Sequence, residues 1–153
     1  AGCGKTTLVG VGLKIEGNQS DGSVEIQDLK IKGAEGSGLY AAYGMKVIMR
    51  GCTIEECGGS GVIANGADIF CDDLQVIGCG KSGVCASYNA TITLSGQGTS
   101  IQGNGTDGYH YGLHAYSSSS STILFVHPLT KEQISSDNSR NWGGRGTIQQ
   151  ISK

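Results

Sequence analysis

Apolar residues alternate with polar ones in short segments that recur along the chain. Three stretches align without a gap: VEIQDLKIKGAEGSGLYAAYG from Val24, VIMRGCTIEECGGSGVIANGA from Val47 and IFCDDLQVIGCGKSGVCASYN from Ile69. Their first residues are 23 and 22 positions apart. A repeat of this length is typical of solenoid proteins, so the pattern predicts a stack of similar coils.

Each repeat contains three short segments with the alternation expected of strands. Two apolar pairs come first, as in Val24/Ile26 and Leu29/Ile31, and a glycine followed by an aliphatic residue opens the third segment. Alternation with a period of two, broken by glycine, predicts strands joined by tight turns. We therefore predict three strands per coil, with equivalent residues of successive coils stacked about 4.8 Å apart in parallel sheets.

This stacking predicts columns of buried side chains that run along the solenoid. The predicted columns are Leu8-Val24-Val47-Ile69-Ile92-Ile123, Ile26-Met49-Cys71-Leu94-Phe125, Ile15-Ile31-Ile54-Val76-Ile101, Leu39-Val62-Val84-Leu113 and Ala41-Ala64-Ala86-Ala115. Residues 1–126 are thus interpreted as coils that start near Leu8, Val24, Val47, Ile69, Ile92 and Ile123. Because the first coil starts in mid-pattern and without Met, we expect the chain to be a segment of a longer polypeptide.

The last part of the chain, residues 127–153, departs from the repeat. It contains the only Pro and the only Trp, a short helical pattern in TKEQIS and a final strand pattern over Thr147 to Ile151. Solenoids need an end cap that covers the open core and blocks pairing at the last strand edges. We therefore interpret residues 127–153 as a C-terminal cap, with Trp142 closing the end of the core.

The repeats resemble the right-handed parallel β-helix repeats of the pectate-lyase-like superfold. The resemblance rests on the recurring Gly-aliphatic strand start and on repeats such as CTIEECGGSGV, and it covers about residues 8 to 125. It implies an all-β, right-handed parallel β-helix of about five coils with an irregular C-terminal cap. Such β-helices often carry an asparagine ladder in one turn, and the equivalent column here is Asn18, Ala34, Cys57, Cys79 and Asn104.

Composition and charge exclude several kinds of partner. A net charge of -2 provides no basic footprint, so we do not expect nucleic acid binding. No apolar run approaches the length of a membrane span. The opening AGCGKTTL holds only half of a nucleotide-binding loop, and Gly10 and Gly12 would break the helix that such a loop requires.

Cysteine and histidine spacing favours neither a metal site nor a bound cofactor. No Cys-x-x-Cys or His pair has the spacing that zinc requires, so we expect no metal and no cofactor. Cys57 and Cys79 would be stacked neighbours, and we favour buried free thiols over a disulfide there, because stacked side chains point the same way. Cys85 is expected to point outward, with no neighbour that would lower its pKa.

Aromatic and polar residues gather on the outward positions of the third strand and on the loop before Gly112. The candidate residues are Tyr40, Tyr43, Asn65, Tyr88, Tyr109, His110, Tyr111, His114 and Tyr116. Tyrosine rings can stack on the apolar faces of sugar rings, so one interpretation is a shallow carbohydrate-binding strip. The other is a loop held against the solenoid by its own tyrosines, and the residue types fit both equally well.

A catalytic centre has weaker support. Enzymes of the superfold that hydrolyse pectin carry paired aspartates, which Asp72-Asp73 resembles, but the rest of that set has no match here. Asp72 is instead expected beside Arg50, and Asp28 lies two coils from Asp73. A general acid and base must converge on one small volume, and the sequence indicates no such pair.

Outward apolar residues provide a third hypothesis, a protein interface. Ile48 and Phe70 are expected to stack on the outer face of the first strand, and Ile63 lies outward on the third strand. The sequence therefore predicts a non-catalytic module that presents a rigid face, first to a polysaccharide or other glycan. The alternatives are a structural or docking subunit of a larger protein assembly, and a polysaccharide lyase or hydrolase.

Overall fold

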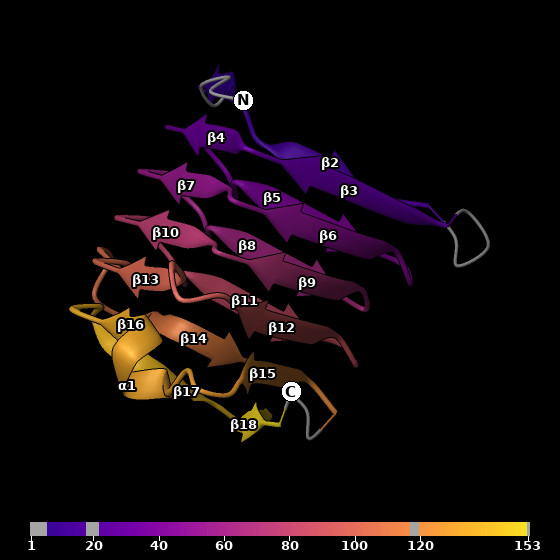
Figure 1. The fold of residues 1–153 in the computed structure, drawn as a ribbon. Coiled ribbons are helices and arrows are strands. Elements are labelled where there is room, and N and C mark those ends of the chain that lie inside the picture. Colours follow the sequence, from indigo (N-terminus) through magenta and orange to yellow (C-terminus); the bar gives the residue numbers. More distant parts are fainter. Residues whose placement is uncertain (1–5, 18–21, 117–119, 153) are drawn as a thin grey trace.

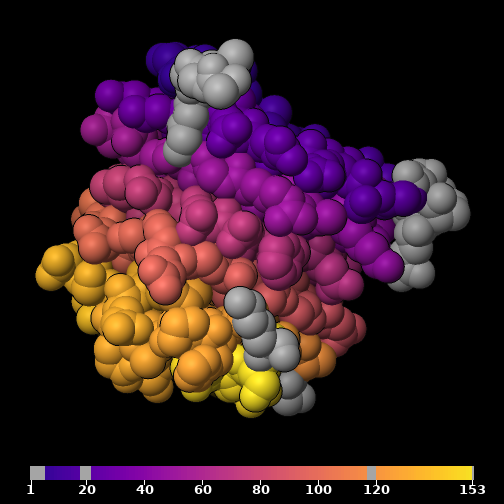
Figure 2. Space-filling model, viewed as in Figure 1, coloured from indigo at the N-terminus to yellow at the C-terminus, as the bar shows by residue number. Residues whose placement is uncertain are grey.

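The protein is a solenoid of parallel strands, seen in a computed structural model that describes residues 6–17, 22–116 and 120–152. Its coils lie one above another from the N-terminal to the C-terminal end (Figure 1). In the space-filling view the same coils form successive bands of colour from indigo to yellow (Figure 2). Each full turn contributes one strand to each of three sheets.

The three sheets are named A, B and C, and every pairing within them is parallel. Sheet A contains β1 (Thr6–Val9), β4 (Leu29–Lys32), β7 (Thr53–Glu55), β10 (Gln75–Ile77), β13 (Ser100–Gln102) and β16 (Ser135–Ser136). Sheet B contains β2 (Leu13–Ile15), β5 (Leu39–Ala42), β8 (Val62–Asn65), β11 (Val84–Ser87), β14 (Tyr111–Ala115) and β17 (Arg140–Gly144). Sheet C contains β3 (Ser23–Gln27), β6 (Lys46–Arg50), β9 (Asp68–Asp72), β12 (Thr91–Ser95), β15 (Thr122–Val126) and β18 (Thr147–Ile151).

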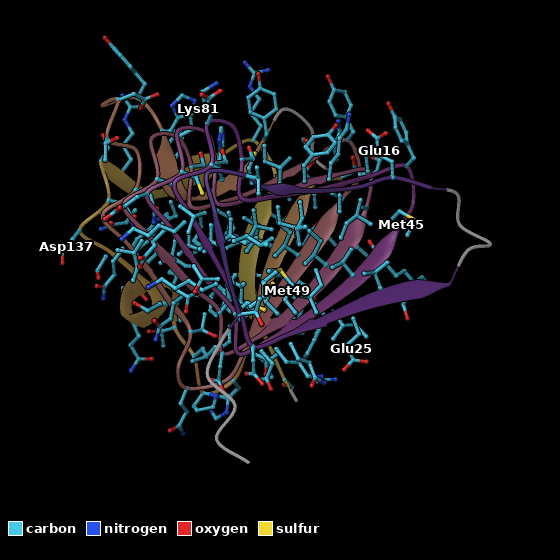
Figure 3. The ribbon with its side chains drawn as sticks, turned by 90° about the horizontal axis from the view of Figure 1, so that it is seen from above. Glu16, Glu25, Met45, Met49, Lys81 and Asp137 are labelled. Atoms are coloured by element: carbon cyan, nitrogen blue, oxygen red, sulfur yellow. The ribbon has the colours of Figure 1, made fainter. Side chains whose placement is uncertain are left out.

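The inward columns predicted for the coils between Val24 and Phe125 are confirmed by the strand register. Ile26 pairs with Met49, and the column continues through Cys71 and Leu94 to Phe125. Alternation sends neighbouring side chains to opposite faces, which Figure 3 shows for Met49 inside the solenoid and Glu25 outside it. The buried columns from all three sheets form one continuous apolar core.

The first coil has a different register from the one predicted. Leu8 pairs with Ile31 in sheet A, whereas the sequence pattern placed it in the column of Val24. Ile15 pairs with Ala41 in sheet B, whereas it was expected to stack on Ile31. The described part of this coil therefore holds a strand of sheet A and a strand of sheet B. A segment as short as Leu13–Ile15 fits either strand pattern, and only its pairing with the next coil decides between them.

The C-terminal residues extend the solenoid further than the sequence predicted. Helix α1 (Lys131–Ile134) and strand β18 (Thr147–Ile151) lie where they were expected, but β16 and β17 add a further turn. The solenoid therefore has about six turns rather than five. Trp142 pairs with Leu113 and packs half-buried against the core, beneath the ammonium group of Lys131, which lies 4.7 Å from the ring centre.

A column of glycines sits where each coil enters sheet B. A Cβ atom added at Gly38 or Gly61 would overlap the side chain of Ile54 or Val76, which belongs to sheet A of the following coil. These glycines therefore allow the corner between sheets A and B to close around a large aliphatic residue. This explains why every repeat opens its third strand with Gly.

The structure contains an asparagine ladder, but the ladder extends from Asn104 towards the C-terminal end, beyond the column that the sequence predicted. The buried Asn104 amide accepts a hydrogen bond from the Cys79 N–H at 2.9 Å and donates one to the Val76 carbonyl at 3.1 Å. Asn138, which sequence reasoning missed, repeats the pattern one coil later by donating to the Ile101 carbonyl at 2.9 Å. Asn18, the other predicted member, lies outside the described residues.

Candidate functional site

The candidate site lies on the outer face of sheet B, which is the upper face in Figure 3, between Glu16 and Lys81. Strand pairing stacks one outward residue from each coil into a column, which runs Lys14, Tyr40, Ile63, Cys85 and His114. We call this surface the sheet B face. Between its outward residues, side chains such as Leu113 and Ala115 are fully buried, as the sequence predicted.

Three rings form a cluster at the C-terminal end of this face. The ring centres of Tyr111 and His114 are 4.7 Å apart, and those of His114 and Tyr116 are 5.1 Å apart with nearly perpendicular planes. Ring pairs at such distances are within the favourable range for tilted and edge-to-face contacts. Tyr111, His114 and Tyr116 are called the aromatic cluster below, and the sequence predicted all of its members.

A buried serine orients the central ring of the aromatic cluster. The Ser82 hydroxyl lies 3.2 Å from His114 Nδ1 and accepts a hydrogen bond from the Tyr111 N–H at 3.4 Å. Burial, with a smaller effect from the charge of His110, holds the pKa of His114 below its usual value of 6.5. A neutral imidazole that accepts from Ser82 at Nδ1 carries its proton on Nε2, which is then a hydrogen-bond donor.

The aromatic cluster borders a shallow hollow of about 530 Å³. Gly144 and Arg145, from the last coil, complete its lining. Arg140 of the same coil donates a hydrogen bond to the Tyr111 hydroxyl at 3.3 Å, and its guanidinium lies 5.6 Å from the Tyr111 ring centre. Sequence reasoning missed Arg140 and Arg145 because it assigned them to the cap, and RNWGG has too few apolar residues to show the alternation of a strand.

Tyr40 and Asn65 form a second polar-aromatic group further along the sheet B face. The Asn65 amide donates a hydrogen bond to the Tyr40 hydroxyl at 2.7 Å, and the Lys14 ammonium lies 5.9 Å from the Tyr40 ring centre. A hollow of about 420 Å³ lies beside this group, next to Gly36. Both residues were predicted, but their direct hydrogen bond depends on the coil-to-coil register.

The remaining predicted tyrosines do not join the aromatic cluster. Tyr43 and Tyr88 are exposed at the turn between sheets B and C, where both have left-handed backbone conformations with φ of 57° and 53°. Tyr109 is exposed on the loop before β14, and His110 of that loop holds its Nδ1 2.6 Å from the Asp107 carboxylate. These four residues therefore flank the sheet B face without lining its hollows.

The five cysteines that the structure describes are free thiols. Cys57 and Cys79 are both free and buried. A hydrogen bond between the two thiols is the main cause that lowers the pKa of Cys57 and raises the pKa of Cys79. Cys85 points outward from β11 as predicted, but burial by its neighbours raises its pKa to about 11, which disfavours a reactive thiolate.

The two aspartates considered as a catalytic pair, Asp72 and Asp73, have different surroundings. Asp72 lies on the outer face of sheet C with its carboxylate 3.8 Å from Arg50, whereas Asp73 occupies a turn and accepts a hydrogen bond from the Gly98 N–H at 2.8 Å. Among the described residues, no group of three His, Cys, Asp or Glu side chains could hold a metal ion. Thr6–Val9, which overlaps the end of the half-motif of a nucleotide-binding loop, is a strand rather than a helix.

The predicted interface residues lie on two different surfaces. Ile48 and Phe70 are stacked neighbours on the outer face of sheet C. Ile63 lies on the sheet B face, between Tyr40 and Cys85. The three apolar side chains therefore cannot form a single patch.

Comparison with known proteins identifies the class of this solenoid. The sequence model of the family described as "Right handed beta helix region" matches residues 11–124. This match covers most of the chain, and the three parallel sheets have the architecture that the description names, so the chain belongs to this family. No curated protein and no solved structure matches the chain. In the described part of the chain, no helix is long and apolar enough to cross a membrane.

Proposed function

We propose that the protein is a carbohydrate-binding β-helix module that holds a glycan chain along the sheet B face. The observation that carries this proposal is the aromatic cluster of Tyr111, His114 and Tyr116 beside its hollow. Rings with polar tips can stack on the apolar faces of sugar rings while their hydroxyl and N–H groups bond the sugar hydroxyls.

The shape of the surface favours a polymer over a single sugar. Tyr40 and His114 occupy the same column three coils apart, a distance of about 14 Å at about 4.8 Å per coil. The hollows beside them are open to solvent, and the strands between them form a flat, regular surface. An extended chain could therefore contact both groups at once, and several weak contacts would add up along it.

The charge and geometry of the site favour binding over catalysis. His114 is the only imidazole of the aromatic cluster, and no carboxylate lines the hollow among the described residues. Most glycoside hydrolases need a pair of carboxylic acid groups on either side of the bond that they cleave. We therefore propose a module that holds the glycan without cleaving it.

Binding to a polysaccharide array, followed by calorimetry on the best ligand, tests this function. Tyr116→Ala and His114→Ala should each weaken binding by about 3- to 10-fold, because a ring contact is worth about 0.5–1.5 kcal/mol. Tyr109→Ala is the matched control, since it removes an exposed ring that does not line the hollow, and its affinity should change less than about twofold.

Two results would contradict the proposed function. The first is a wild-type protein that binds no polysaccharide on the array. The second is an equal loss of affinity in the Tyr109→Ala control and in the two cluster variants, which would place the ligand elsewhere.

A further inference from the structure

The outer face of sheet C, on another side of the solenoid, carries an ordered pattern of charge. Its three outward columns follow from the strand register. They are Ser23-Lys46-Asp68-Thr91-Thr122-Thr147, Glu25-Ile48-Phe70-Thr93-Leu124-Gln149 and Gln27-Arg50-Asp72-Ser95-Val126-Ile151. We call this surface the sheet C face.

Two neighbouring strands of the sheet C face, β6 and β9, have opposite charges. Strand β6 places Lys46 and Arg50 on either side of Ile48, and strand β9 places Asp68 and Asp72 on either side of Phe70. Ile48 and Phe70 are half-buried, and a hollow of about 460 Å³ lies over this region.

The two charged columns differ in how far they are already neutralised. Arg50 lies 3.3 Å from Glu25 and 3.8 Å from Asp72 within the chain. Lys46 and Asp68 are both exposed and make no ion pair with the described residues. The charges of Lys46 and Asp68 are therefore the ones available to form ion pairs with a partner.

We propose that the sheet C face binds a second copy of this chain about a two-fold axis that runs parallel to the strands, midway between β6 and β9. This rotation turns the sheet over and places β6 of one copy opposite β9 of the other, with both strands pointing the same way. Lys46 then faces Asp68 of the second copy, Ile48 faces Phe70, and Arg50 faces Asp72. Every contact occurs twice, as an isologous interface requires.

The charges also discriminate against the other way of stacking the two faces. A two-fold axis along the length of the solenoid would place β6 opposite β6 and β9 opposite β9. Lys46 would then face Arg50, and Asp68 would face Asp72, so that like charges meet on both strands. Juxtaposed like charges disfavour an interface, so the pattern selects the axis parallel to the strands.

The proposed interface has the layout of a small, reversible contact. Sheets pack face to face about 10 Å apart, with an apolar centre of Ile48 and Phe70 and a polar rim. Only strands β3, β6, β9 and β12 of each copy overlap when the two copies are related by this axis. The area that they bury on each copy is less than the roughly 800 Å² per partner of a standard stable interface. We therefore expect a weak dimer with a dissociation constant in the micromolar range or above. The sheet B face remains exposed to solvent in this dimer, so the proposed dimer does not depend on the proposed glycan binding.

Charge reversal tests the pairing of Lys46 with Asp68. Sedimentation velocity between about 10 μM and 1 mM, at low salt, should show a concentration-dependent dimer for the wild type. Lys46→Glu and Asp68→Lys should each weaken it at least tenfold, because each places like charges opposite one another twice. Mixed in equal amounts, the two variants should form a heterodimer, since the introduced glutamate then faces the introduced lysine and the two native residues face each other.

Lys81→Glu is the matched control, because it makes the same charge change at an exposed position away from the sheet C face (Figure 3). It should dimerise like the wild type, and circular dichroism should show that all variants are folded. A wild type that stays monomeric at 1 mM overturns the proposal. Single variants that dimerise normally would also overturn it, and so would a mixture that fails to associate.

Discussion

At the residue scale, the environment of each side chain decides its chemistry more than its type does. His114 is half-buried between two tyrosine rings and held by Ser82, whereas His110 lies beside a carboxylate on a loop. Cys85 and Cys57 are both free thiols, yet burial raises the pKa of Cys85 and a thiol neighbour lowers the pKa of Cys57. Ser82 and Cys79, which act on His114 and Cys57, belong to neighbouring coils.

His114 should make folding stability depend on pH. Because burial holds its pKa below 6.5 in the folded protein, the unfolded chain takes up the proton first as the pH falls. The free energy of unfolding should therefore decrease as the pH falls from about 6.5 to the lowered pKa. Above about pH 6.5, His114 should not make the free energy of unfolding depend on pH. Denaturant unfolding of wild type and His114→Asn across this range measures the difference.

Nitrogen NMR of the His114 ring provides an independent check. At pH 7.5 the ring should be neutral with its proton on Nε2, because Nδ1 faces the Ser82 hydroxyl. Ser82→Ala should shift the ring towards a mixture of tautomers. A wild-type ring that is charged at pH 7.5, or that carries its proton on Nδ1, would contradict this interpretation.

At the element scale, each strand depends on a neighbour from another coil. The glycines before β5, β8 and β11 make room for a sheet A side chain of the following coil, as Gly61 does for Val76. Asn104 and Asn138 work in the same way, because each bonds to backbone groups of the coil before it. Regular turns are thus maintained by contacts about one repeat apart in sequence.

Gly61→Ala should destabilise the protein by about 1–3 kcal/mol, because the added Cβ would overlap Val76 inside a packed corner. Gly36→Ala is the matched control: its Cβ would meet no atom within 4 Å. The control should change the free energy of unfolding by less than about 0.5 kcal/mol. Urea unfolding followed by circular dichroism measures both, and equal effects of the two substitutions would show that the corner is not tightly packed.

At the scale of the whole molecule, the solenoid is a one-dimensional stack whose two ends differ. Within the described residues, β1, β2 and β3 pair with strands on one side only, and Leu8, Leu13 and Val24 are only partly buried. The middle coils are paired on both sides, with fully buried columns. In such stacks, stability is roughly a sum over coils and the contacts between neighbours.

Hydrogen exchange should therefore reveal a gradient along the stack. Amides of β1, β2 and β3 should exchange at least tenfold faster than those of β9, because the first coil can open without disturbing the rest. Mass spectrometry of peptic fragments measures this directly. Equal protection of β3 and β9 in dilute monomeric protein would instead show that the solenoid opens only as a single cooperative unit.

Much of the fold was predictable because residues close together in the sequence define each repeat. Alternation and glycine spacing within one repeat identify the strands, and matching two repeats predicts their register, as Ile31, Ile54 and Val76 show. The members of the aromatic cluster were also predictable, since Gly112 marks where the third strand of its coil begins. Ile15 was misplaced because its segment is too short for alternation to choose a register.

The sequence by itself determined the class of fold, the inward columns from Val24 to Phe125 and the residues that face outward, because a strand's alternation and a repeat's period are properties of neighbouring residues. Only the tertiary structure decided that residues after Val126 wind on for another turn, that Asn138 extends the ladder, and that Arg145 completes the hollow beside Tyr116. These contacts join residues about 30 positions apart across unequal loops, and it is the coiling of the chain, rather than any local pattern, that brings them together.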